Sequence, residues 1–200
     1  MVFHKYKLIV VGIPKNASQS LYSILRNSSD IENDHFTYNE IRKNHDKELL
    51  DTYQSLTVVR NPYDRAVSSY GQFLHFTSYP LKYPYIRNFE QYLTTIYYQN
   101  IKELNEEPWW VPQWEFVTND NKILVDTVLR FENLNLEWEN FVKNYNSKRS
   151  NKFKIFPNLK VINKNDEKDE NYITYYNSKC IDLVNELYKK DFELFNYKML

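Results

Sequence analysis

The 200-residue chain has only two glycines and one cysteine, and these shortages exclude several classes of protein. With Cys180 as the sole cysteine, neither an internal disulfide framework nor a multi-cysteine metal site can form. We expect Cys180 to be a small buried residue on a helix near the carboxyl end. Two glycines and seven prolines leave little room for flexible linkers. We therefore expect one compact domain over residues 1–200, whose core is supplied by the 42% of residues that are hydrophobic.

The chain also lacks a surplus of charge and a long apolar run. Its 26 basic residues balance 26 acidic ones, whereas nucleic-acid binders usually carry an excess of Lys and Arg. No uninterrupted apolar segment reaches the ~20 residues needed to cross a bilayer. The first residues, MVFHKYKLIVVG, enter a strand pattern instead of a signal-peptide core. We expect a soluble, cytoplasmic protein with no nucleic-acid partner and no membrane segment; the oligomeric state is not indicated.

Strand and helix patterns alternate along the chain. Residues 7–11 and 56–59 read as buried strands that each lead through a short loop into a helix, and 123–131 adds one or two strands. The expected helices cover 18–25, 39–53, 136–145 and 178–195, together with a helix whose face carries Val67, Tyr70, Gly71 and Leu74. This order predicts a three-layer α/β fold with a central, mainly parallel sheet flanked by helices. Ligands of such folds bind at the carboxyl ends of the strands.

The first loop, GIPKNASQS over residues 12–20, lies where nucleotide-binding proteins hold phosphate. It lacks the Gly-Lys-Ser/Thr ending of a Walker A motif, and Asn16 stands where an ATP-binding loop needs a hydroxyl for Mg²⁺. The amides of the following helix attract anions, and Lys15 adds an ammonium group. Ser18 or Ser20 is expected to cap that helix. The loop predicts a phosphate or sulfate site without magnesium; the alternative is an ordinary turn that carries a lysine.

The second loop supplies another cationic group. Arg60 directly follows the strand at 56–59, and Ser68 lies eight residues later, about two turns into the next helix. A guanidinium fork and a hydroxyl together can clamp a second phosphate. Because both loops follow parallel strands, we expect them to face one crevice and to hold a ligand with two separate anionic groups.

Several blocks of the sequence resemble sulfotransferases that use 3′-phosphoadenosine 5′-phosphosulfate, and the carbohydrate-modifying branch in particular. They are IPKNASQSL, VVRNPYDRAVSSY, WVPQWEF, VLRFENLNLEWENF and NELYKKDFELFNY. The resemblance implies a P-loop-like fold and transfer of a sulfuryl group to a hydroxyl, and no metal is expected. It implies that the first loop holds the 5′-phosphosulfate and the second motif the 3′-phosphate. The donor-binding residues so implied are Pro14, Lys15, Asn16, Ala17, Ser18, Gln19, Ser20, Arg60 and Ser68.

Two catalytic residues follow from this reading. Lys15 would stabilise the negative charge that builds on the leaving phosphate oxygen. His35 would accept the proton of the acceptor hydroxyl, because HFTY resembles the segment that carries the base in the heparan sulfate 2-O-sulfotransferase group. An imidazole, with a usual pKa of about 6.5, suits that task near neutral pH. Asp34 and Glu40 are the reserve bases, and a solvated loop histidine is the alternative for His35.

The segment EEPWWVPQWEF suggests contacts to the acceptor, which we expect to be a saccharide hydroxyl. Of its three tryptophans we expect two in the core, and we assign Trp110 and Gln113 to the acceptor site because indole faces stack on sugar rings and amides hydrogen-bond to hydroxyls. Two other functions stay open. One is an ATP-dependent small-molecule kinase, and the other is a non-catalytic module that binds a nucleotide or a glycan.

Overall fold

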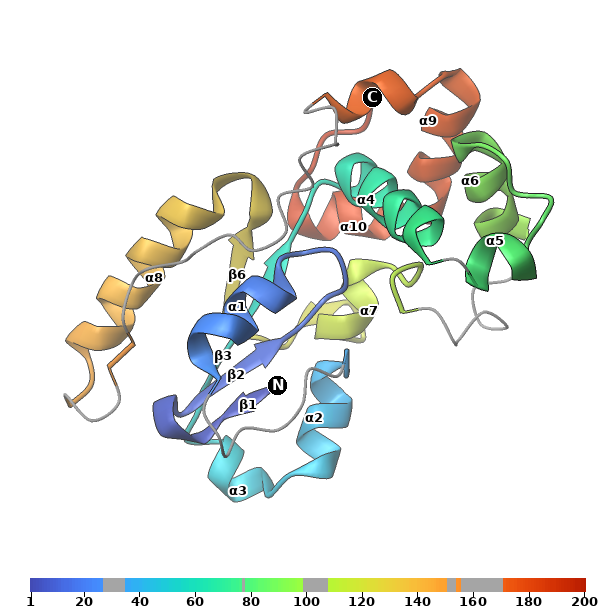
Figure 1. Ribbon diagram of the computed structural model, residues 1–200. Coiled ribbons are helices and arrows are strands. Elements are labelled where there is room, and N and C mark those ends of the chain that lie inside the picture. Colours follow the sequence, from blue (N-terminus) through green and yellow to red (C-terminus); the bar gives the residue numbers. More distant parts are fainter. Residues whose placement is uncertain (27–34, 77, 99–107, 151–153, 156–170) are drawn as a thin grey trace. The chain divides into compact units, whose positions relative to one another are not determined.

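The computed structural model describes residues 1–26, 35–76, 78–98, 108–150, 154–155 and 171–200 (Figure 1). The chain divides into two compact units, Met1–Arg60 with Gln113–Lys164, and Asn61–Pro112 with Asn165–Leu200. Each unit is built from two separate stretches of sequence and has its own hydrophobic core. The single domain expected over residues 1–200 stays a prediction.

A four-stranded sheet organises the first unit, in the order β1-β2-β3-β6. Strand β2 (Leu8–Val11) pairs in parallel with β3 (Gln54–Val59), and β3 pairs in parallel with β6 (Thr127–Arg130). Only the short β1 (Val2–Phe3) runs antiparallel within this sheet. The α/β fold with a central, mainly parallel sheet flanked by helices is therefore confirmed. A separate antiparallel pair joins β4 (Thr118–Asn119) to β5 (Lys122–Ile123).

Side chains alternate between the two faces of this sheet along each strand, and both faces are buried. Val10 and Val58 lie in the cluster that includes side chains of α1 (Ser18–Leu25) and α8 (Leu134–Ser147). Ile9, one residue away and on the opposite face, is completely buried as well. The other helices that the structure describes in this unit are η1 (His4–Tyr6), α2 (Tyr38–Asn44), α3 (Lys47–Leu50), α7 (Gln113–Val117) and η2 (Phe131–Asn133). Because both faces of the sheet are covered, a ligand can reach it only at the ends of the strands, where ligands of such folds bind.

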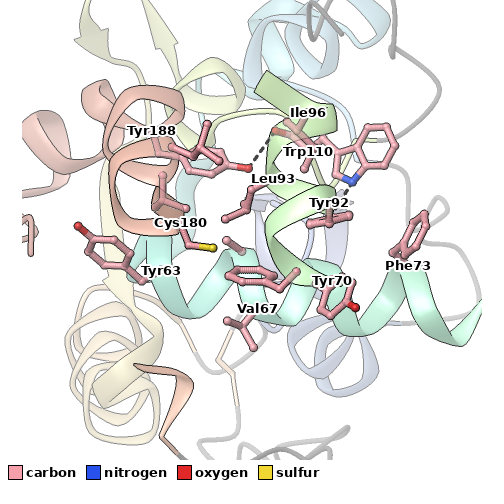
Figure 2. Close-up of a cluster of buried hydrophobic side chains, with 14 of the residues drawn as sticks. Tyr63, Val67, Tyr70, Phe73, Tyr92, Leu93, Ile96, Trp110, Cys180 and Tyr188 are labelled. Atoms are coloured by element: carbon pink, nitrogen blue, oxygen red, sulfur yellow. Dashed lines mark hydrogen bonds between the residues drawn. The ribbon is translucent and has the colours of Figure 1, made fainter. Parts of the chain in front are cut away.

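The second unit is helical. Its described residues form α4 (Pro62–His75), α5 (Ser78–Lys82), α6 (Phe89–Tyr98), η4 (Tyr172–Tyr175), α9 (Ser178–Leu187) and α10 (Lys189–Phe195). Figure 2 shows its aromatic core, in which Trp110 Nε1 donates to the Tyr92 hydroxyl at 2.6 Å. The Tyr92 hydroxyl also bonds to Ser69 Oγ at 2.7 Å. Burial raises the pKa of Tyr188 to about 12 and raises the pKa of Tyr92 as well. Cys180, on α9, is buried in this core as expected.

Two expectations about helices were wrong in detail. The helix expected over 39–53 is divided into α2 and α3, because His45 adopts an extended backbone. The helix expected over 178–195 ends at Leu187 and restarts at Lys189. Leu74, which shares a face of α4 with Val67, Tyr70 and Gly71, is 53% exposed. No helix among the described residues is both long enough and apolar enough to cross a bilayer.

Candidate active site

The first loop has an unusual backbone between β2 and α1. Lys15 and Ala17 adopt left-handed conformations, with φ values of 69° and 61°. A residue with a side chain pays about 1–2 kcal/mol for this conformation, so the loop is strained at two positions. Strained backbone of this kind is concentrated at functional sites, and turns with left-handed residues form concave nests of N–H groups that bind anions. The geometry therefore fits the phosphate or sulfate site that we predicted here.

Helix α1 begins directly after this loop and has no side-chain cap. Its N-cap residue is Ala17, which carries no hydrogen-bonding group. The expected cap by Ser18 or Ser20 was wrong, because the helix starts at Ser18 and both serines lie within its first turn, where they are buried. The first amides of an α-helix have no partner within the helix. Here an anion, rather than a side chain, can bind at the helix start.

Arg60 lies beside the first loop. Its Nη1 donates a hydrogen bond to the backbone carbonyl of Lys15 at 2.9 Å. The guanidinium carbon lies 4.0 Å from the centre of the Phe131 ring, and only 6% of Arg60 is exposed. The two cationic residues that the sequence assigns to separate loops are therefore neighbours at the carboxyl ends of adjacent parallel strands. Their roles as phosphate ligands stay predictions.

A buried amide network ties the same two strand ends together. Asn16 Nδ2 donates to the backbone carbonyl of Val58 at 2.8 Å and to Gln113 Oε1 at 2.6 Å. Gln113 Oε1 also accepts from the amide of Arg60 at 2.9 Å, while Gln113 Nε2 donates to the Arg60 carbonyl at 2.9 Å. Both amide side chains are at most 1% exposed. This network could not be expected from the sequence, since no local pattern links residues 97 positions apart.

His35 reaches the start of the first loop. Its Nδ1 lies 2.6 Å from the carbonyl oxygen of Gly12, the residue that follows β2. A carbonyl can only accept, so the Nδ1 of a neutral His35 carries the hydrogen and Nε2 carries the lone pair. This arrangement orients the ring in the form that a general base requires. The catalytic role of His35 stays a prediction.

The reserve base Glu40 has another task in this structure. Its carboxylate accepts hydrogen bonds from the backbone amide and the hydroxyl of Thr37, at 2.7 and 2.9 Å. The amide of Glu40 in turn donates to Thr37 Oγ1, so the two residues form a capping box at the start of α2. Asp34 lies outside the described residues.

Comparison with known protein families identifies the family of this chain. Residues 1–198, nearly the whole chain, match the sulfotransferase family. The chain belongs to that family. No curated protein and no solved structure matched it. The protein is thus a transferase of sulfuryl groups, and its parallel sheet with the first loop at a strand end agrees with the P-loop-like fold of sulfotransferases.

Other residues that we assigned to the site of this sulfotransferase differ in exposure. Pro14 is buried and Gln19 is exposed, whereas Ser68 is half-buried in α4 of the second unit, so its pairing with Arg60 stays a prediction. Trp109, which is partly buried, packs against the same core as Trp110, which is 1% exposed. The burial of Trp110 and that of Gln113 favour structural roles over the acceptor contacts that we expected.

Phe131, which we did not assign from the sequence, lies beside Arg60 of the candidate site. It follows β6, and its ring packs on the guanidinium of Arg60. A cation held against an aromatic face is partly fixed in position. Within the described residues, no three His, Cys, Asp or Glu side chains lie together as metal ligands would. Reaction without a metal stays a prediction.

Proposed function

We propose that this sulfotransferase moves a sulfuryl group from 3′-phosphoadenosine 5′-phosphosulfate to a hydroxyl group of a carbohydrate. The observation that carries the proposal is the contact between Arg60 and Lys15, which puts two cationic residues side by side at the ends of β2 and β3. The donor carries two separate anionic groups on one adenosine, and two adjacent cationic grips suit such a molecule.

Each grip has a distinct task. Lys15 and the uncapped start of α1 bind the 5′-phosphosulfate, and Arg60 with Ser68 binds the 3′-phosphate. When bound, the donor supplies an activated sulfuryl group. Lys15 and the amides of α1 stabilise the negative charge that appears on the phosphate oxygen as its bond to sulfur breaks. Donors that are fixed before the reaction avoid the cost of reorganising around that charge.

His35 is the general base. The acceptor oxygen forms a bond to sulfur while His35 Nε2 takes the hydroxyl proton. The Gly12 carbonyl holds the Nδ1–H, so the lone pair stays on Nε2 and the imidazolium that forms keeps a hydrogen-bond partner. Since Gly12 begins the first loop, this contact anchors the base to the loop that carries Lys15.

The proposal of a carbohydrate acceptor is based on the resemblance of residues 110–116 and 128–141 to sequence blocks of the carbohydrate-modifying sulfotransferases. The test is incubation of the wild-type protein with the phosphosulfate donor and a panel of acceptors. The panel contains glycosaminoglycans, neutral glycans, small alcohols and tyrosine peptides, and products are detected by mass spectrometry. We expect sulfated saccharides together with the desulfated nucleotide.

Other results would overturn the proposal in distinct ways. Donor binding without any sulfated product would indicate a non-catalytic module. Phosphorylated products that need ATP and Mg²⁺ would indicate a kinase. Sulfation of tyrosine peptides or small alcohols alone would keep the reaction and exclude the carbohydrate acceptor.

A further inference from the structure

The side chain of Gln113 pairs with the backbone of Arg60 as a neighbouring strand would. Its Nε2 donates to the Arg60 carbonyl, and its Oε1 accepts from the Arg60 amide, both at 2.9 Å. Two parallel hydrogen bonds fix both the position and the orientation of the peptide at the end of β3. The guanidinium of Arg60 contacts the first loop. By holding the Arg60 backbone, Gln113 therefore fixes the point from which this side chain extends.

The same Gln113 oxygen also bonds to the first loop. Asn16 Nδ2 donates to Oε1 at 2.6 Å, and Asn16 lies between the two left-handed residues Lys15 and Ala17. One buried side chain therefore bonds to the strained segment of the first loop and to the peptide of the second. Because Gln113 is completely buried, each of these bonds forms away from water, where a missing partner is costly.

We propose that Gln113 is a positioning residue that sets the spacing between the two phosphate grips and contacts neither donor nor acceptor. This inference rests on the proposed function, because the spacing matters only if one ligand spans both grips. It replaces the acceptor contact that we expected for Gln113. A residue that only supports the core would change the stability of the protein but not the affinity of its folded form for the nucleotide.

The test compares Gln113→Met with Gln54→Met. Methionine has a side chain of similar length but cannot form the hydrogen bonds of the glutamine amide. Gln54 is the matched control, since it also donates to a neighbouring element but lies at the opposite end of β3, where its Nε2 bonds to Thr127 Oγ1. Affinity for the desulfated nucleotide, 3′-phosphoadenosine 5′-phosphate, is measured by calorimetry well below the unfolding temperature. We expect Gln113→Met to lose about tenfold or more in affinity and Gln54→Met to stay within about twofold of wild type.

A second variant and a second measurement cover the remaining outcomes. Gln113→Glu keeps the size of the side chain and an oxygen that can accept the hydrogen bonds from Asn16 and from the Arg60 amide. When ionised, it cannot donate to the Arg60 carbonyl, so we expect weaker nucleotide binding from this variant as well. Hydrogen exchange of residues 13–20 is followed in the protein without nucleotide. We expect faster exchange there in either Gln113 variant than in Gln54→Met at equal global stability.

These measurements separate the two proposals. If the wild type fails to bind the nucleotide, the proposed function fails, while faster exchange of the first loop still supports positioning by Gln113. Unchanged nucleotide affinity in folded Gln113→Met, or unchanged exchange of residues 13–20, would overturn the positioning role.

Discussion

Arg60 Nη1 donates a hydrogen bond to the backbone carbonyl of Lys15 across 2.9 Å. The acceptor is a residue held in a left-handed conformation, so the guanidinium supports a strained part of the first loop. Arg60 also packs on the ring of Phe131 and its peptide is held by Gln113. Three segments that are distant from Arg60 in sequence thus determine where this one positive charge lies.

Arg60→Ala is expected to weaken binding of 3′-phosphoadenosine 5′-phosphate more than Lys15→Ala does. The Arg60 variant loses the proposed phosphate ligand and the hydrogen bond that supports the first loop, whereas Lys15→Ala keeps the backbone carbonyl. Charge-assisted hydrogen bonds imply losses of about 10- to 100-fold, measured by calorimetry. Arg42→Ala is the control, because Arg42 pairs with Asp51 on the surface. Wild-type affinity in either site variant would remove that residue from the donor site.

His35→Ala is expected to lower turnover by about 10²- to 10⁴-fold while donor affinity changes little, because a general base acts only on the acceptor proton. Steady-state kinetics and calorimetry on the same preparation measure the two effects. His45→Ala is a matched control, since His45 Nδ1 also bonds to a backbone carbonyl, that of Ile41. Normal turnover without His35 would transfer the role of base to a carboxylate.

Gly12→Ala is expected to destabilise the protein by about 1–3 kcal/mol and to weaken nucleotide binding. A Cβ atom at Gly12 would lie 3.3 Å from the Cβ of Ser18, in the first turn of α1, and 2.9 Å from the end of the Met1 side chain. The Met1 side chain can move, but a shift of Ser18 would move the start of α1 away from the predicted anion site.

The other glycine provides the control for this substitution. A Cβ atom at Gly71 meets nothing within 4 Å, and Gly71 lies inside α4. Gly71→Ala should stabilise the protein by about 0.5–1 kcal/mol, because alanine loses less backbone entropy in a helix. Denaturant titration of both variants gives the two values. Equal effects of the two substitutions would mean that close packing at Gly12 is unimportant.

Tyr145→Phe is expected to change the stability of the protein in alkali. Burial raises the pKa of Tyr145 to about 12, and its hydroxyl donates to the backbone carbonyl of Tyr6. A pKa that is raised by folding contributes to the stability of the protein. This contribution is complete at pH values below the pKa in the unfolded chain, about 10, and it is lost as the pH rises from there towards the pKa in the folded protein. The wild type should therefore lose more free energy of unfolding between pH ~10 and ~12 than the variant does.

At neutral pH the wild type should be the more stable protein. Tyr145→Phe loses one hydrogen bond there, which lowers its free energy of unfolding by about 1 kcal/mol. Urea titrations across this pH range measure both effects. Tyr98→Phe, at a side chain that is 75% exposed, is the control and should change neither. A parallel decline of wild type and Tyr145→Phe in alkali would contradict the raised pKa.

Local patterns predicted the parts of the fold that depend on local chemistry. The strands at 7–11 and 56–59 match β2 and β3 closely, because runs of β-branched residues suit a strand that is buried on both faces. The position of Lys15 after the first strand and of Arg60 after the second followed from the same patterns. The division of the 39–53 helix did not, since the extended backbone at His45 has no strong local signal.

The amino-acid sequence alone determined the order of strands and helices, the two cationic loops and the resemblance to sulfotransferases, because these depend on neighbours within a few residues. Only the tertiary structure decided that Arg60 supports Lys15, that His35 reaches Gly12, and that Gln113 is buried between Asn16 and Arg60. These contacts join residues 23 to 97 positions apart. Their partners are chosen by the parallel pairing of β2 with β3 and by the need of buried amides for hydrogen bonds, and neither is visible in a short stretch of chain.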